Sequence, residues 1–165
     1  FVSFARRCRS LNPSPEIERM EFEELGSRAE LAELEAELNR ERCQPDSKVA
    51  ICDLGASDDL NPRYFVARID GRHAGGATFT QTDDGGCELH KLYVHPAFRQ
   101  RGVGAALAEK VMKIASELNY PEIDIEMSGD SLEFWDRWVG ERPFEYHGTR
   151  QFSVILKPGG PSTEG

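Results

Sequence analysis

The sequence feature that most constrains the fold is the run from Cys87 to Leu118, which joins a strand pattern, a basic loop and a helix pattern. Branched and aromatic side chains predict a strand over residues 88–94. His95-Pro96 ends that strand, because proline lacks an N–H group for a ladder and restricts the residue before it. From about Gly102, apolar residues recur at spacings of three and four, which predicts an amphipathic helix. Its apolar stripe consists of Val103, Leu107, Val111, Ile114 and Leu118.

The segment between this strand and helix, Arg99-Gln100-Arg101-Gly102-Val103-Gly104-Ala105, is called here the anion loop. The first turn of a helix carries N–H groups without intrahelical partners and the positive end of the helix dipole. Glycines in the loop remove Cβ atoms that would keep a phosphate away, and its two arginines can add charge-assisted contacts. The loop is not a Walker motif and lacks the third glycine of a dinucleotide fingerprint. We predict a diphosphate site; an ordinary turn with solvated arginines is the alternative.

The order and spacing of these residues resemble the GNAT superfamily of acyl-CoA-dependent N-acetyltransferases. The signature of that family is Arg/Gln-x-x-Gly-x-Gly/Ala after a strand that ends in a hydrophobic-x-Val-x-Pro-like phrase, and here Leu92-Tyr93-Val94-His95-Pro96 precedes the anion loop. The resemblance implies acetyl-CoA as co-substrate, with backbone N–H groups of residues 100–105 on its pyrophosphate and the strand end paired with its pantetheine arm. The residues expected to bind coenzyme A are Leu92, Tyr93, Val94, Arg99, Gln100, Arg101, Gly102, Val103, Gly104, Ala105, Ser131 and Trp135.

Composition narrows the class of protein. A chain of 165 residues, 39% hydrophobic and 30% charged, is typical of one globular domain. No apolar run approaches the roughly 20 residues of a membrane span, so no membrane partner is expected. The net charge of -9 argues against a nucleic-acid-binding face. It is compatible with a cationic acceptor, but solubility alone is the favoured explanation of this charge. The four cysteines show no metal-ligand spacing, which predicts reduced thiols, a cytoplasmic location and no metal.

The rest of the chain predicts an α/β fold with a mixed, mostly antiparallel sheet flanked by helices. Ser27 and Glu30 form a capping box before a helix with Leu31, Leu34 and Leu38 on one face, and Asp130 and Glu133 form a second one. Asp70-Gly71 predicts a hairpin turn. Strands are expected over 20–25, 64–69, 77–82, 123–127, 144–147 and 151–156, with a short one at 48–52. Residues 1–15 are expected to be an extension, 16–157 the acetyltransferase domain and 158–165 a flexible tail.

Transfer to an amine requires a base, because an ammonium group must lose a proton before its nitrogen can attack a thioester. We predict Glu88, which precedes Gly102 by the offset that family members with a strand glutamate show. Apolar strand neighbours should raise its pKa toward neutrality. His90, two residues on, is a weaker second candidate, and a solvent-facing Glu88 is the alternative. Backbone N–H groups near residues 92–94 are expected to stabilise the carbonyl oxygen.

The acid that protonates the leaving thiolate is where the sequence departs from the family. The family often has Asn-x-x-Ala-x-x-Phe-Tyr in the late helix, and the matching positions here are Ser128, Ser131, Phe134 and Trp135. An indole N–H donates a hydrogen bond but cannot act as a phenolic acid. Tyr93 or Tyr146 could substitute, or the thiolate could leave unaided.

Three functions follow from the sequence as hypotheses. The first is an N-acetyltransferase that acts on a primary amine, on a small molecule or a peptide, by direct attack in a ternary complex. The second is an acyl-CoA-binding sensor or interaction module without turnover, and the third a nucleotide-binding regulator. The acceptor-binding segment should lie within residues 44–63, and a homodimer through the late strands is compatible with the resemblance.

Overall fold

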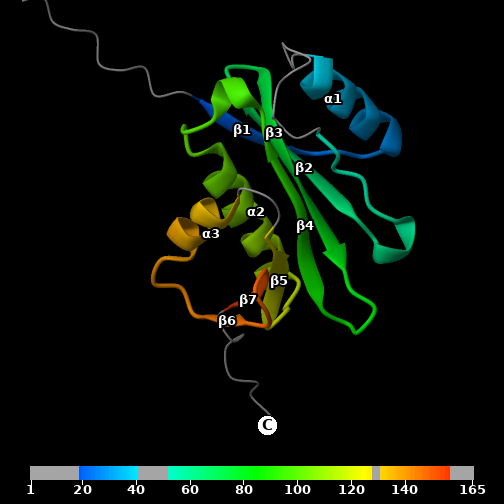
Figure 1. Cartoon of the computed structure of the whole chain (residues 1–165). Coiled ribbons are helices and arrows are strands. Elements are labelled where there is room, and N and C mark those ends of the chain that lie inside the picture. The colour runs from blue at the N-terminus through cyan, green and yellow to red at the C-terminus, as the bar shows by residue number, and fades with distance from the viewer. Residues whose placement is uncertain (1–18, 41–51, 128–130, 157–165) are drawn as a thin grey trace, which may run out of the picture.

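The computed structural model describes residues 19–40, 52–127 and 131–156. They form a seven-stranded mixed sheet in the order β1-β2-β3-β4-β5-β7-β6, with helices on both faces (Figure 1). Adjacent strands are antiparallel except β4 and β5, which run parallel across α2. The elements are β1 (Met20–Glu24), α1 (Arg28–Arg40), η1 (Asp58–Leu60), β2 (Arg63–Ile69), β3 (Arg72–Gln81), β4 (Cys87–Val94), η2 (Pro96–Phe98), α2 (Val103–Glu117), β5 (Glu122–Glu126), α3 (Leu132–Val139), β6 (Phe144–Tyr146) and β7 (Gln151–Ile155). The mixed, mostly antiparallel α/β fold predicted from the sequence is confirmed.

Side chains at alternate strand positions point to opposite faces of the sheet and pack into two separate cores. On one face, α2 and α3 pack over a large core that includes Phe65, Phe79 and Ile125. On the other face, α1 packs its buried leucines over a smaller core that includes Tyr64 and Val66. Figure 1 shows α1 on one side of the sheet and α2 and α3 on the other.

A β-bulge in β4 changes which residues face which core. Leu89 pairs with Phe79 and Lys91 pairs with Thr78, so His90 has no partner on β3. The extra residue shifts the alternation by one. Leu89 before the bulge and Leu92 after it therefore face the same large core.

The parallel ladder between β4 and β5 is short. It joins Glu88 to Asp124 and Leu89 to Ile125, and no further pair is recorded in the described residues. Beyond it, residues 91–94 of β4 have no ladder pair with β5 in the described part of the chain. Such an edge can accept an added extended chain.

Several sequence-based expectations were correct and others need correction. As predicted, the Ser27 hydroxyl accepts a hydrogen bond from the N–H of Glu30, and Asp70 and Gly71 form the hairpin turn between β2 and β3. Both turn residues have positive φ. The strand predicted to start at residue 77 starts at Arg72, because its glycine- and alanine-rich first half carries little strand signal. Leu118 lies past the end of α2 and is 46% exposed, so the predicted stripe is one residue too long.

Some expectations lie wholly or mostly outside the described residues. These are the short strand at 48–52, the capping role of Asp130, the position of Ser128, and both proposed terminal segments. Cys52 and Cys87 are buried free thiols. No helix in the described part of the chain is both long and apolar enough to cross a membrane.

Candidate functional site

The anion loop is shaped by two residues with left-handed backbone. Gln100 has φ of 62° and Gly102 has φ of 79°, and Gly102 is the N-cap of α2. Left-handed residues beside right-handed ones turn successive N–H groups toward the same side, which forms a concave anion site. The segment from His95 to Ala108 contains no acidic residue. The loop therefore fits a phosphate group in both backbone shape and charge.

The two arginines of the loop are exposed and partly engaged. The Arg99 Nε donates to the carbonyl of Val94 at 3.2 Å, which ties the loop to the end of β4. The Arg101 guanidinium lies 5.5 Å from the ring centroid of Phe98. The His95 Nδ1 accepts from the N–H of Ala97 at 3.1 Å and so caps the turn between strand and loop.

Close packing fixes the start of α2 against its neighbours. A Cβ atom on Gly104 would lie 3.1 Å from the Phe134 ring and 3.4 Å from a Val94 methyl carbon. A Cβ atom on Gly75 would lie 2.4 Å from the carbonyl oxygen of Tyr93, so β3 and β4 can approach here only with glycine. The loop and the end of β4 are thus held in one rigid arrangement.

Glu88 and His90 lie together on β4, on the face opposite α2. The His90 Nδ1 is 3.8 Å from the Glu88 Oε2, and the Glu88 side chain is 24% exposed. Burial raises the pKa of Glu88, the charge of His90 opposes this, and repulsion from Glu126 and Asp124 raises the pKa further. The direction agrees with the sequence-based expectation, and the Glu88 side chain is partly buried rather than fully exposed.

A row of polar side chains crosses the sheet through Glu88. Strand register places Thr80, Glu88, Asp124, Ser153 and Glu145 side by side on one face of five consecutive strands. We call these five residues the polar row. Sequence reasoning found only Glu88, because the other members become neighbours through register, which no local pattern encodes.

The far side of the polar row is a hydrogen-bonded chain. The Ser153 hydroxyl donates to the Asp124 carboxylate at 2.5 Å, and the His147 Nε2 is 2.6 Å from the same hydroxyl. Since the one Ser153 proton points to Asp124, the His147 Nε2 must carry the proton that it donates to Ser153. Ser153 is fully buried, so Asp124 is held in a fixed position.

The candidate acids Tyr93 and Tyr146 and the expected coenzyme residues Ser131 and Trp135 lie in different surroundings. Tyr93 is buried in the small core under α1, and Tyr146 is 56% exposed and packs on Phe144 and Phe152. Trp135 is buried among the rings of Phe134, Trp138 and Phe152. Ser131 is the N-cap residue of α3 and makes no side-chain capping hydrogen bond.

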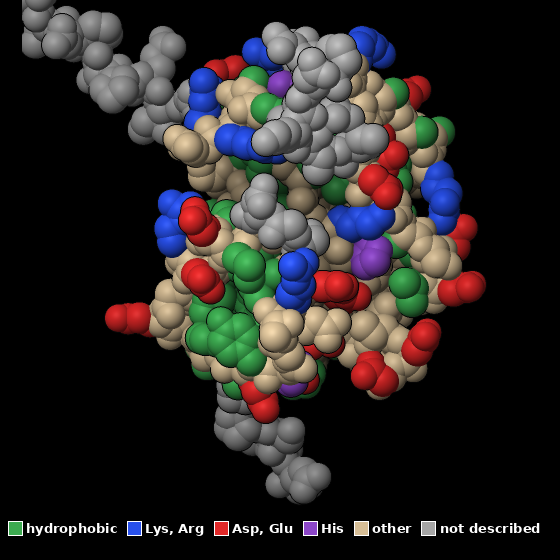
Figure 2. Space-filling model, in the orientation of Figure 1, with side chains coloured by type: hydrophobic (Ala, Val, Ile, Leu, Met, Phe, Trp, Pro, Cys, Tyr) green, Lys and Arg blue, Asp and Glu red, His purple; other side chains and the backbone are tan. Residues whose placement is uncertain are grey.

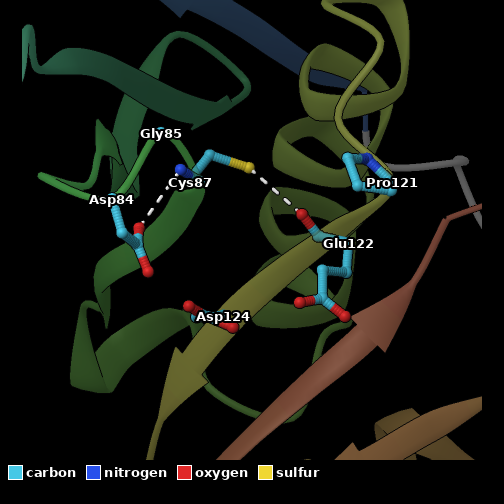
Figure 3. A pocket seen from close by; sticks show the side chains of 7 residues that line it. Asp84, Gly85, Cys87, Pro121, Glu122 and Asp124 are labelled. Atoms are coloured by element: carbon cyan, nitrogen blue, oxygen red, sulfur yellow. Dashed lines mark hydrogen bonds between the residues drawn. The ribbon is translucent and has the colours of Figure 1, made fainter.

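An acidic pocket lies beside the polar row. It has a volume of about 250 Å³ and opens between the β3–β4 turn and the start of β5. Figure 3 shows the carboxylates of Asp84, Glu122 and Asp124 around it, with the Cys87 Sγ turned to the Glu122 carbonyl. Burial raises the pKa of Cys87 to about 12, so this thiol is not a nucleophile at neutral pH. The described residues contain no group of three or more side chains suited to a metal ion.

A mixed sheet whose middle parallel strands separate next to a helix N-terminus with a concave N–H loop is an α/β architecture suited to a phosphorylated ligand. The profile of the acetyltransferase (GNAT) family matches residues 28–140. This chain belongs to the GNAT acetyltransferase family, which confirms the resemblance seen in the anion loop.

Relatives and solved structures agree with this assignment. An uncharacterised N-acetyltransferase of Mycobacterium tuberculosis is 33% identical over 96 residues, which cover 58% of this chain and 61% of that protein. The match thus spans less than two thirds of the relative. A GNAT-family acetyltransferase of Staphylococcus aureus has a TM-score of 0.59 at 16% identity over 84% of this chain and 100% of its own. An acetyltransferase of Bacillus anthracis, solved with acetyl coenzyme A, has a TM-score of 0.50 at 15% identity over 65% and 69%.

Proposed function

We propose that the protein transfers the acetyl group of acetyl-CoA to a primary amine by direct attack in a ternary complex. The observation that carries the proposal is the position of Glu88. Its partly buried carboxyl stands where β4 and β5 separate, on the same strand whose end leads into the anion loop. Family membership supports acetyl transfer, and the Bacillus anthracis structure supports acetyl-CoA as co-substrate.

The residues that would hold the co-substrate follow from the shape of the site. The N–H groups of residues 100–105 would bind the pyrophosphate, and the edge of β4 at Leu92, Tyr93 and Val94, beyond its ladder with β5, would bind the pantetheine arm. Bound acetyl-CoA supplies a thioester carbonyl as the acyl donor. Val103 and Ala105 lie in the first turn of α2, directly after the left-handed residues of the loop. Trp135 packs against Phe134, and Phe134 packs against Gly104.

Side chains of the protein would remove the proton from the acceptor ammonium. Glu88 accepts the proton of the acceptor ammonium, because its raised pKa makes it a stronger base than an exposed glutamate. His90 lies close enough to take part in moving that proton away. N–H groups at the edge of β4 would orient the carbonyl that is attacked. No acid from Tyr93 or Tyr146 is needed, since a thiolate is a fair leaving group.

The test is a comparison of wild type with Glu88→Gln, using acetyl-CoA and a panel of primary amines. We expect thiol release together with a product heavier by one acetyl group, and a fall in kcat of about 100-fold or more in the variant. Affinity for coenzyme A, measured by calorimetry, should stay within about twofold. Equal rates in both proteins would contradict the role of Glu88, and coenzyme binding without any acetylated product would favour a sensor without turnover.

A further inference from the structure

Thr80 is a buried polar residue to which the proposed reaction has so far given no role. The residue is 0% exposed, and its Oγ1 has no hydrogen-bond partner in the described part of the chain. A buried hydroxyl of this kind is unfavourable, because it has given up its hydrogen bonds to water and gained none in return. Unsatisfied buried groups are uncommon in native structures, so this one points to a partner that another state of the site supplies.

The residue that lies directly opposite Thr80 is Glu88. The pairs between β3 and β4 join these two residues, whereas the pairs between β2 and β3 begin at Arg63 and Phe79. Among the strands that the structure describes, only β4 therefore lies beside Thr80. Both side chains leave the sheet on the same face, with their Cβ atoms about 4.5–5.5 Å apart. A glutamate side chain is long enough to span that separation and bring its carboxylate to the Thr80 hydroxyl.

Thr78 shows what such a hydroxyl does when a partner is present. It lies two residues before Thr80 on β3, on the same face, and it is also 0% exposed. Its Oγ1 donates to the carbonyl oxygen of Leu54 at 2.6 Å. The two threonines thus share a strand, a face and complete burial, and they differ in their partner. Since Leu54 serves Thr78, the acceptor opposite Thr80 in the register is the Glu88 carboxylate.

The charged groups that act on Glu88 come from β4 and β5. The His90 Nδ1 is 3.8 Å from the Glu88 Oε2, which is longer than a hydrogen bond. Asp124 and Glu126 repel the Glu88 charge from β5. Two like charges and a histidine therefore surround the carboxyl, and β3 contributes the uncharged Thr80. A donor from β3 would stabilise the ionised form against the repulsion.

The other charges considered are engaged or lie farther away. The Lys91 Nζ donates to the carbonyl of Gly55 at 2.8 Å and lies 3.2 Å from the Asp53 carboxylate. Asp136 is exposed on α3, on the opposite side of the sheet. Figure 2 shows basic, acidic and histidine side chains close together near the middle of the face drawn. Salt screens such surface charges but has little effect on a hydrogen bond from a buried hydroxyl, so salt separates the two influences.

We propose that the Thr80 hydroxyl donates a hydrogen bond to the ionised Glu88 carboxylate and so positions it to accept the proton of the amine. This inference rests on the proposed function and adds a positioning residue to it, since the buried Thr80 acts only through Glu88. A change of the Glu88 rotamer, away from the one that faces His90, would form the contact. A carboxylate accepts a stronger hydrogen bond than a neutral carboxyl does, so the contact favours the ionised form.

The test is the pH dependence of kcat/KM in Thr80→Val, where a methyl group replaces the hydroxyl. The pH at which kcat/KM falls to half on the acid side should rise by about one unit, because the ionised Glu88 loses a donor. The rise should be the same at low and high sodium chloride, and Thr80→Ser should behave like wild type. An unchanged profile would overturn the inference. A shift to lower pH would also overturn it, because the hydroxyl would then accept a hydrogen bond from the protonated carboxyl.

Thr78→Val is the matched control. It removes a hydroxyl of equal burial from the same face of β3, but one that is bonded to Leu54. Its thermal midpoint should fall, because the Leu54 carbonyl loses its partner. The acid side of its pH profile should stay in place. A shift as large as that of Thr80→Val would show that the loss of any buried hydroxyl on this face moves the profile, which would overturn the inference.

A direct titration separates this inference from the transferase function. The carboxyl carbon of Glu88, followed by NMR and assigned by its loss in Glu88→Gln, reports the pKa of Glu88 without turnover. That pKa should be about one unit higher in Thr80→Val than in wild type. Such a rise without any acetylated product would support the hydrogen bond and contradict the transferase function. Turnover that depends on Glu88, with the same Glu88 pKa in both proteins, would overturn the hydrogen bond alone.

Discussion

Glu88 combines partial burial with two like-charged neighbours, and both raise its pKa. As the proposed base, Glu88 would work only when ionised, so kcat/KM should fall on the acid side as Glu88 becomes protonated. We call this fall of kcat/KM at low pH the acid limb of the profile. Its position depends on the pKa of Glu88, so a single substitution near Glu88 should shift it.

Glu126→Gln should move the acid limb of the kcat/KM profile to lower pH. The substitution removes a repulsive charge, so the Glu88 carboxylate becomes easier to form and its pKa falls. The profile is measured with one amine at subsaturating concentration over the pH range in which the fold is intact. Asp136→Asn should leave the limb in place, and a shift to higher pH in Glu126→Gln would contradict the assignment of the limb to Glu88.

The sequence singles out Glu88 as the candidate base through its spacing before Gly102, whereas the partners of Glu88 could not be predicted. Asp124 and Ser153 lie far from it in sequence, and only the β4–β5 and β5–β7 registers bring them together. In the sequence, nothing distinguishes Thr80 from any other threonine in a strand. The left-handed backbone of Gln100 also has no local signal, since glutamine rarely adopts it.

At the scale of an element, the start of α2 depends on the backbone of Gly102. Gly102→Val should weaken coenzyme A binding by at least about tenfold, because a β-branched residue strongly disfavours a φ of 79° and would pull the N–H groups of the loop out of line. Calorimetry with coenzyme A measures the loss.

Gly85→Val is the matched control for Gly102→Val. Gly85 has φ of 85° and, like Gly102, no atom within 4 Å of an added Cβ, but it lies in the β3–β4 turn. Both variants should lose a similar 1–2 kcal/mol of stability or somewhat more. Only Gly102→Val should lose affinity, and an equal loss of affinity in both would show that the loop is not the coenzyme site.

The helices and most strands were predictable because their apolar periodicity is strong. β3 was shortened in the prediction because its first half, His73-Ala74-Gly75-Gly76, lacks the branched residues of a strand. Gly75 is nevertheless required there, since a Cβ atom would collide with the Tyr93 carbonyl. The most tightly packed part of β3 therefore has a sequence pattern that favours a turn, and the pattern does not predict a strand there.

The whole molecule consists of two parts of the sheet that meet at a two-pair ladder and share α2. A ligand that enters between β4 and β5 should tie these parts together. With acetyl-CoA at about 100 times its dissociation constant, the native state gains about 2.7 kcal/mol, which is close to 100-fold slower exchange for amides that open only when the ligand leaves.

Hydrogen exchange with and without acetyl-CoA tests this expectation. Protection should rise over residues 91–105 and over β5, and should change little in β1, which lies at the far edge of the sheet. ATP at the same concentration serves as the control ligand. Equal protection by ATP would favour a nucleotide-binding regulator over a coenzyme A enzyme.

Because of the bulge at His90, the number of residues in β4 cannot change even by one without turning side chains to the wrong face. Deleting His90 would restore simple alternation, so that either Leu89 or Leu92 would turn away from the large core. Natural variation by insertion or deletion should therefore avoid this strand. A family member whose β4 has lost one residue would have to recruit its base from another position, because the carboxyl and the end of β4 could no longer face their present sides together.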